Sequence, residues 1–214
     1  LREEDQRALI HASIALCRHG DPSLSHRILK KLNQIPFDSL AAEDQLALLR
    51  AYSLCFIRLG QPAPALINVV IGNLDPFFPA DDEQVNTELC RVLSYLDAPQ
   101  IVKKTISLMK ITETRTLDYD KEMLSRHEYG KEILKTMANT PNSQNIQYAY
   151  SLRRVQNGWT LADRKYFFSW MNETLRKSGG KSFAGYMRAI REDAIQHLAP
   201  EVATSVSWLL GDIE

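Results

Sequence analysis

Two stretches of this sequence, 40 residues apart, decide the fold. Residues 13–37 read SIALCRHGDPSLSHRILKKLNQIPF, and residues 53–77 read SLCFIRLGQPAPALINVVIGNLDPF. Aligned without gaps they share seven of 25 positions, where ordinary composition gives about one or two identities by chance. The shared positions are Ser13/Ser53, Arg18/Arg58, Gly20/Gly60, Pro22/Pro62, Asn33/Asn73, Pro36/Pro76 and Phe37/Phe77. The sequence therefore predicts an internal repeat.

The glycines and prolines indicate what each repeat folds into. Gly20 precedes Pro22 by two residues, and Gly60 precedes Pro62 in the same way. Glycine tolerates the left-handed conformation that closes a helix, and proline suits the first turn of the next one. Each repeat is therefore expected to be a helix, a tight turn and a second helix.

A third, more divergent copy follows the first two. Apolar residues at i, i+3, i+4 and i+7 predict one helical face, a turn comes next, and a second helix is expected over residues 101–109. The stripe is Leu89, Val92, Leu93 and Leu96, and the turn is Asp97-Ala98-Pro99. Helix pairs repeating every 34–47 residues or so are typical of α-solenoids. We therefore expect an all-α fold without β-sheet, namely a right-handed α-solenoid of HEAT-like helix pairs.

The expected organisation is a single helical-repeat domain over residues 1–214. Its repeats are placed at about 5–37, 43–77, 82–112 and 142–177, with an insertion at 113–141 and C-terminal helices at 182–210. Because the chain starts without Met and without an apolar signal core, we expect it to be a fragment of a larger multidomain protein.

Smaller signals refine this plan. Thr160 and Asp163 predict a capping box at the start of a helix over 160–177, and Ser182 is expected to cap the helix that follows it. The insertion is expected to carry one amphipathic helix, and the run 67–71 is ambiguous because it also fits the period of a strand. The apolar residues of the insertion are Met123, Leu124, Ile133, Leu134 and Met137.

Composition excludes several classes of protein. With 44% apolar residues and 26 basic against 26 acidic side chains, the chain is neither disordered nor low in complexity. Its longest apolar run, 62–74, is shorter than the roughly 20 residues that a membrane span requires. The three cysteines, Cys17, Cys55 and Cys90, lie within apolar helical patterns and are expected to be buried thiols.

No catalytic signature is present. Residues 178–182 read SGGKS, yet a phosphate-binding loop needs a glycine where Leu175 stands, so an inter-helix linker is the better interpretation. The five histidines form no H-E-x-x-H motif, and the chain contains no G-x-S-x-G motif. We therefore predict no catalytic residue, no metal ligand and no cofactor, although an enzyme whose residues converge from distant helices stays possible on sequence grounds.

Basic and aromatic residues gather in the last third of the chain. Residues 148–186 hold nine aromatic side chains, and residues 150–193 hold nine basic groups against four acidic ones. Such a mixture binds anionic partners or single-stranded nucleic acid in some proteins. Otherwise the aromatics are core residues and the cations a solvated face, with Arg188 paired to Glu192; the zero net charge favours this second interpretation. The candidate partner-binding residues are Arg153, Arg154, Trp159, Lys165, Lys181, Arg188 and Arg191.

The sequence leaves two alternatives open for the environment of Trp159 and two for that of Trp208. Trp159 follows a turn and precedes the capping Thr160, a position typical of an apolar staple; the alternative is an exposed stacking platform. Trp208 and Leu209 lie close to the last residue. They either face other domains at an open end of the array or fold back onto the helix before them.

Several segments resemble one family of proteins. They are residues 74–79 (LDPFFP), 86–99, 126–130 (RHEYG), 139–141 (NTP), 148–153 (YAYSLR), 158–160 (GWT), 166–170 (YFFSW), 179–186 (GGKSFAGY) and 190–191 (IR). They resemble the helical-repeat region of large exported proteins of planctomycetes and Bacteroidetes. Those proteins join a sugar-dehydrogenase-like β-propeller to HEAT-like repeats and a C-terminal c-type cytochrome. The chain itself has no C-x-x-C-H motif for haem attachment.

The resemblance implies a periplasmic or extracellular location and a role as a spacer or docking platform. We therefore expect a non-catalytic scaffold or protein-interaction module whose partners are protein domains, in the same chain or in another. The alternative is a HEAT-like nucleic-acid binder, or an enzyme resembling the DNA glycosylases built on such repeats, which would use Arg153, Trp159 and Lys181.

Overall fold

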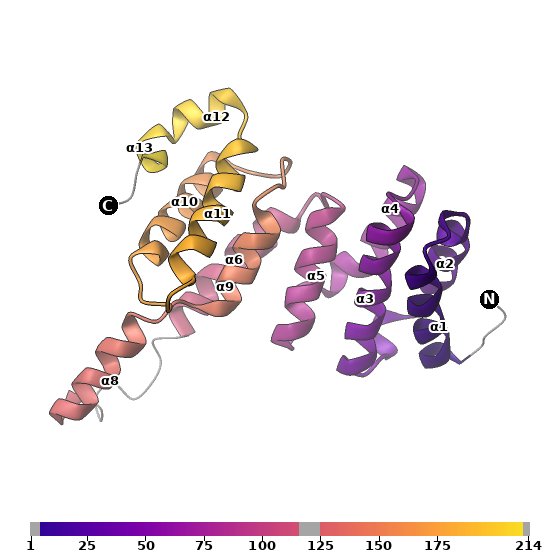
Figure 1. The fold of residues 1–214 in the computed structure, drawn as a ribbon, viewed down its shortest axis with the longest axis horizontal. Helices are drawn as coiled ribbons and strands as arrows, with labels where there is room; N and C mark the ends of the chain where they lie inside the picture. The colour runs from indigo at the N-terminus through magenta and orange to yellow at the C-terminus, as the bar shows by residue number, and fades with distance from the viewer. Residues whose placement is uncertain (1–4, 116–124, 212–214) are drawn as a thin grey trace. The chain divides into compact units, whose positions relative to one another are not determined.

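The computed structural model describes residues 5–115 and 125–211, and within these ranges it contains helices and no strand. The all-α prediction is therefore confirmed for the described part of the chain, including the ambiguous run 67–71, which lies inside a helix. The chain divides into two compact units, residues 1–101 and 102–214, and each is described by itself (Figure 1).

The first unit is built around one long central helix. Helix α3 packs against α1 and α2, which precede it in the sequence, and against α5, which follows it. It contributes seven buried residues: Leu48, Leu49, Ala51, Tyr52, Cys55, Phe56 and Leu59. The elements are α1 (Gln6–His19), η1 (Pro22–Leu24), α2 (Ser25–Leu32), η2 (Phe37–Ser39), α3 (Ala42–Leu59), α4 (Pro64–Leu74), η3 (Asp75–Phe77) and α5 (Glu83–Tyr95).

Positions that the sequence pairs at a separation of 40 residues touch one another in this unit. The side-chain amide of Asn73 donates a hydrogen bond to the backbone oxygen of Asn33 at 3.1 Å. The rings of Phe37 and Phe77 lie with their centroids 5.3 Å apart. The first two contacts therefore join identical residues of the two aligned stretches. In addition, the Tyr52 hydroxyl donates to Oδ1 of Asn33 at 2.7 Å and ties α3 to the segment after α2.

The turns of the first unit follow the expected chemistry only in part. Gly20 closes α1 in the left-handed conformation, with a φ of 82°, and its N–H donates to the Leu16 oxygen. The prediction that Pro22 and Pro62 open the second helices is wrong. Pro22 starts a short 3-10 turn before α2, and Pro64 is the proline that occupies the first turn of α4. That position suits Pro64 because the first helical N–H groups lack partners within the helix.

The cysteines are buried. Cys17, Cys55 and Cys90 are free thiols with no exposed surface, which confirms the prediction of buried thiols.

The second unit consists of helices that pack mainly around α10. Helix α10 packs against α11 and α13, and α9 packs against α11. The helices are α6 (Ile101–Arg115), which begins at the boundary, then α8 (Glu128–Ala138), α9 (Ser143–Leu152), α10 (Leu161–Leu175), α11 (Phe183–Gln196), α12 (Pro200–Ser205) and α13 (Ser207–Leu210). Helix α8 is the helix expected in the insertion, whereas Met123 and Leu124 lie outside the described residues.

The two predicted helix starts have different outcomes. At α10 the capping box is present: Thr160 Oγ1 accepts a hydrogen bond from the Asp163 N–H at 3.1 Å, and the Asp163 carboxylate accepts one from the Thr160 N–H at 3.2 Å. Ser182 precedes α11 but forms no side-chain capping bond. Its backbone is already helical, whereas a capping residue needs an extended backbone to aim its oxygen at the next amides.

The segment after α11 folds back onto the unit. Leu209 is buried, and its backbone oxygen accepts hydrogen bonds from Asn172 Nδ2 at 3.0 Å and from Arg191 Nη2 at 2.9 Å. Trp208, its neighbour, is 70% exposed. Leu209 is therefore packed as the fold-back alternative expects, whereas Trp208 is not.

The described helices are short or polar relative to a membrane-spanning helix. None of them combines the length and the hydropathy that a membrane span requires.

The two glycines Gly20 and Gly72 provide a matched test of the helix boundaries. Neither would bring an added Cβ within 4 Å of another atom, but only Gly20 has a positive φ. We expect Gly20→Ala to lower the free energy of unfolding by about 1 kcal/mol. Gly72→Ala, inside α4, should raise it by about 0.5 kcal/mol. Urea unfolding measures both, and equal signs would contradict the assigned helix ends.

Candidate functional site

Trp159 packs against the helix that it precedes. Its indole Nε1 donates a hydrogen bond to the Val155 oxygen at 2.8 Å, and its ring centroid lies 5.1 Å from that of Phe167 in α10. The guanidinium carbon of Arg164 lies 3.9 Å from the centroid of the Trp159 ring. One face of the ring is therefore covered, as expected of a staple rather than of an open stacking platform.

Arg164 is a buried cation with few partners. The residue is 5% exposed; its Nη2 donates to the Val155 oxygen at a long 3.4 Å, and its Nε has no hydrogen-bond partner. Burial lowers the pKa of this guanidinium to about 10. The group still carries its positive charge at neutral pH.

Arg164 is not among the residues that the sequence predicts to bind a partner, although its position in α10 carries a signal. Arg164, Phe167, Phe168 and Met171 occupy positions i, i+3, i+4 and i+7 of α10 and are all buried. A cation inside an apolar helical stripe lies on the face that packs against the core, and a buried charge needs compensation. The pattern could have identified this residue.

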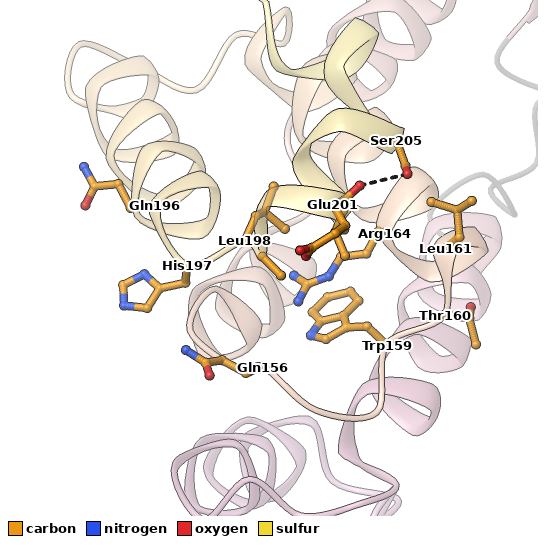
Figure 2. Close-up of a pocket in the computed structure, with 12 residues that line it drawn as sticks. Gln156, Trp159, Thr160, Leu161, Arg164, Gln196, His197, Leu198, Glu201 and Ser205 are labelled. Atoms are coloured by element: carbon orange, nitrogen blue, oxygen red, sulfur yellow. Dashed lines mark hydrogen bonds between the residues drawn. The ribbon is translucent and has the colours of Figure 1, made fainter.

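A pocket of about 520 Å³ adjoins Arg164 and Trp159. One wall comes from the turn before α10 and its first residues, and the other from the end of α11 and from α12 (Figure 2). Its volume is within the range of about 300–1,000 Å³ found for small-molecule sites. The lining residues are Gln156, Trp159, Thr160, Leu161, Arg164, Gln196, His197, Leu198, Ala199, Glu201, Val202 and Ser205.

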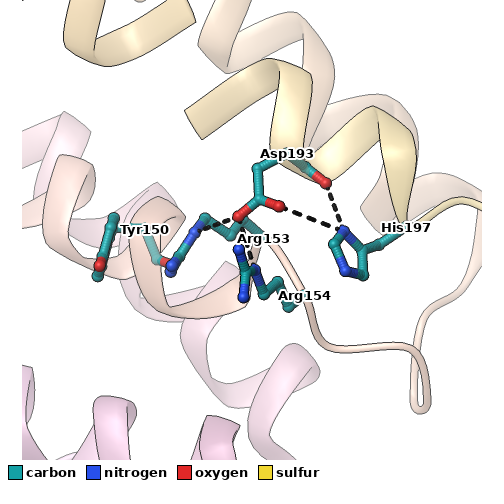
Figure 3. A network of polar contacts seen from close by, with 5 residues as sticks. All are labelled: Tyr150, Arg153, Arg154, Asp193 and His197. Carbon is teal, nitrogen blue, oxygen red and sulfur yellow. Dashed lines mark hydrogen bonds and ion pairs between the residues drawn. The ribbon is translucent and has the colours of Figure 1, made fainter. Parts of the chain in front are cut away.

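Next to the pocket, Asp193 joins two arginines and a histidine (Figure 3). Its Oδ2 accepts hydrogen bonds at 2.7 Å from Arg153 Nε and at 2.7 Å from Arg154 Nε. His197 Nδ1 lies 3.4 Å from Oδ1 of Asp193 and 2.7 Å from its backbone oxygen. The hydrogen bond from Arg154, and then that from Arg153, lowers the pKa of the Asp193 carboxyl. We call this cluster the Asp193 clamp, and it fastens the end of α9 to α11.

The seven candidate partner-binding residues do not all lie at one place. Arg153 and Arg154 meet in the Asp193 clamp, and Arg191 is buried with its Nε bonded to Asn172 Oδ1 at 3.0 Å. Trp159 lines the pocket. The exposed cations Lys165, Lys181 and Arg188 have no ion-pair partner among the described residues, so the expected pair of Arg188 with Glu192 is not formed.

Of the described residues, no group of three or more His, Cys, Asp or Glu is arranged to hold a metal ion.

Comparison with known proteins provides no relative. No family model matches the chain, and no curated protein or solved structure matches it. The functional proposal therefore rests on the geometry of the chain itself, above all on the contacts of Asn33 with Asn73 and of Phe37 with Phe77.

Removal of the Trp159 side chain tests its packing role. We expect Trp159→Ala to lower the free energy of unfolding by about 3 kcal/mol, because the ring is partly buried against Phe167. Trp159→Phe keeps an aromatic ring but loses the indole hydrogen bond to Val155 and should cost about 1 kcal/mol. Guanidinium chloride unfolding measures both, and a midpoint unchanged by Trp159→Ala would show that the interpretation as a staple is wrong.

The Asp193 clamp predicts a pH-dependent stability. Because the pKa of Asp193 is lower in the folded chain than in the unfolded one, its contribution is complete above the unfolded value of about 4. It disappears as the pH falls through the lower folded value. We expect Asp193→Asn to cost about 1–3 kcal/mol at pH 7, and thermal melts at decreasing pH should show the two proteins converging. A deficit that grows towards low pH would contradict the clamp.

Proposed function

We propose that this chain is a HEAT-like α-solenoid module that holds protein domains in place and does not itself catalyse a reaction. The observation that carries the proposal is the contact between residues 40 positions apart, Asn33 with Asn73 and Phe37 with Phe77. Such contacts are what stacking of successive helix pairs produces, because each pair then presents the same positions to its neighbour.

The order of packing in the first unit supports the same proposal. Helix α3 contacts both α1 and α5, so the first helices of three successive predicted repeats lie against one another. An amphipathic helix pair cannot bury its apolar face alone, and stacked pairs do so while leaving a long surface for partners.

The partners that we propose come from the family resemblance. They are a sugar-dehydrogenase-like propeller and a c-type cytochrome, in a protein located in the periplasm or outside the cell. Of the seven candidate partner-binding residues, the exposed cations Lys165, Lys181 and Arg188 are those that a partner reaches without breaking an ion pair among the described residues. They are therefore the residues that we assign to docking.

Nucleic acid is the less favoured partner for two reasons. Arg153 and Arg154 already neutralise Asp193, which leaves less uncompensated positive charge for phosphates. In addition, the Arg164 guanidinium covers a face of Trp159, where a base would have to stack.

Titration with isolated domains tests the proposal. We expect the chain to bind the propeller or the cytochrome domain of such an exported protein in isothermal titration calorimetry. The triple variant Lys165→Glu/Lys181→Glu/Arg188→Glu should bind at least tenfold more weakly. The substitutions replace three positive charges that attract the partner by three negative charges that repel it. A single-stranded oligonucleotide should bind neither protein.

A control variant has the same change of charge at three exposed residues of the first unit. Arg27, Lys30 and Arg50 are exposed residues of the first unit, and their triple replacement by Glu should leave binding of the domains unchanged. Absence of binding to both domains, or equal loss in the two triple variants, would contradict the proposed docking role. Salt-dependent binding of the oligonucleotide would favour the nucleic-acid alternative instead.

A further inference from the structure

The pocket beside α10 contains a charge that the protein does not balance. Arg164 is 5% exposed, and of the carboxylates that the structure describes none forms an ion pair with it. Glu201 also lines the pocket but is exposed and is not paired with Arg164. Burial of an unpaired cation costs free energy, which a protein normally offsets with a carboxylate or a full set of hydrogen bonds.

The contacts of the Arg164 guanidinium offset the free-energy cost of its burial only in part. The Trp159 ring supplies a cation–π contact at 3.9 Å, and Arg164 Nη2 donates one long hydrogen bond of 3.4 Å to the Val155 oxygen, which also accepts from Trp159 Nε1. The Nε atom has no partner, although a guanidinium can donate five hydrogen bonds. Arg191, in the same unit, shows the contrast, because it donates to Asn172, to Leu209 and to Gly211.

We propose that this pocket is a binding site for a carboxylate attached to an apolar group, with Arg164 as the residue that recognises the carboxylate. The planar guanidinium matches a carboxylate geometrically through paired N–H groups. The apolar group of the ligand lies against Trp159, Leu198 and Val202, which form part of the lining. The site belongs to the second unit alone and does not depend on the stacking of repeats.

The charges of the lining favour a carboxylate over a phosphate. Arg164 is the only Lys or Arg in the lining, and Glu201 adds a negative charge. A monovalent carboxylate is balanced by one guanidinium, whereas a phosphate near pH 7 carries up to two charges and would also be repelled by Glu201. The same chemistry is found in a small carboxylic acid and in the C-terminal residue of a peptide.

Pairs of ligands that differ only in this group test the proposal on the whole chain. The probes are N-acetyl-leucine and N-acetyl-leucinamide, and then N-acetyl-trialanyl-leucine and its C-terminal amide. Binding is measured from the NMR shift of the Trp159 indole N–H. We expect each acid to bind at least tenfold more tightly than its amide. Equal binding of acid and amide, or no binding of either acid, overturns the proposal.

The two acids distinguish the source of the carboxylate. Equal affinity of N-acetyl-leucine and the tetrapeptide supports a small acid that fills the pocket, and tighter binding of the tetrapeptide supports a protein C-terminus. Inorganic phosphate serves as a third probe, and we expect it not to displace N-acetyl-leucine at equal concentration. Displacement by phosphate would overturn the choice of a carboxylate.

Substitutions in the pocket separate recognition from folding. Arg164→Met should abolish binding of N-acetyl-leucine without lowering the melting temperature, because an unpaired buried charge is removed. Arg164→Lys should weaken binding about fivefold, since it keeps the charge but loses the fork. Arg176→Met makes the same change at an exposed arginine outside the pocket and should leave binding unaltered. Unaltered binding in Arg164→Met overturns the proposal, and if that variant does not fold, the acid and amide pairs still decide.

Substitution of Glu201 should raise the affinity for N-acetyl-leucine, whereas substitution of Arg164 lowers it. Glu201→Gln removes the like charge beside the ligand, so N-acetyl-leucine should bind two- to fivefold more tightly. If Glu201 instead serves as the counter-ion of Arg164 in solution, the same substitution lowers the melting temperature and does not tighten binding. That result would also overturn the proposal.

Discussion

The first unit depends on one constraint: the apolar face of its long helix α3 must be covered by other helices. Helix α3 shows how the constraint is met, since α1, α2 and α5 all pack on it and its buried residues gather on one broad face. Because burial of apolar surface is the main favourable term in folding, the helices on either side hold α3 in place. The polar contacts between Asn33 and Asn73 and between Asn33 and Tyr52 add register to this packing.

Two buried arginines of the second unit, Arg191 and Arg164, differ in how completely they are hydrogen-bonded. Arg191 donates hydrogen bonds to Asn172, Leu209 and Gly211, so it ties the last helix to α10 and α11. Arg164 has a tryptophan face and one long hydrogen bond. A buried polar group that is satisfied stabilises the fold, whereas one that is left with free donors is costly unless a ligand completes it. Arg191 therefore needs no ligand to complete its hydrogen bonds, whereas Arg164 has donors left for one.

The proposed docking residues and the proposed ligand site lie in different parts of the basic third of the chain. Asp193 pairs with Arg153 and Arg154, at the end of α9, and thereby removes two cations from the surface available to a partner. Lys165, Lys181 and Arg188 remain exposed. Composition alone cannot separate these groups, because it counts charges without their counter-ions.

Local chemistry in the sequence determined the helical class, the end of α1 at Gly20 and the identity of positions 40 residues apart. Periodicity, glycine conformation and capping act over a few residues, so they can be read without a structure. The Thr160 capping box and the packing of Trp159 were predictable for that reason, whereas the missing cap at Ser182 depended on its backbone angles. Only the tertiary structure decided which cations are paired, because Arg153 and Asp193 are 40 residues apart in sequence. The same holds for the pocket at Arg164, whose walls come from segments that the sequence separates by the whole length of α10 and α11.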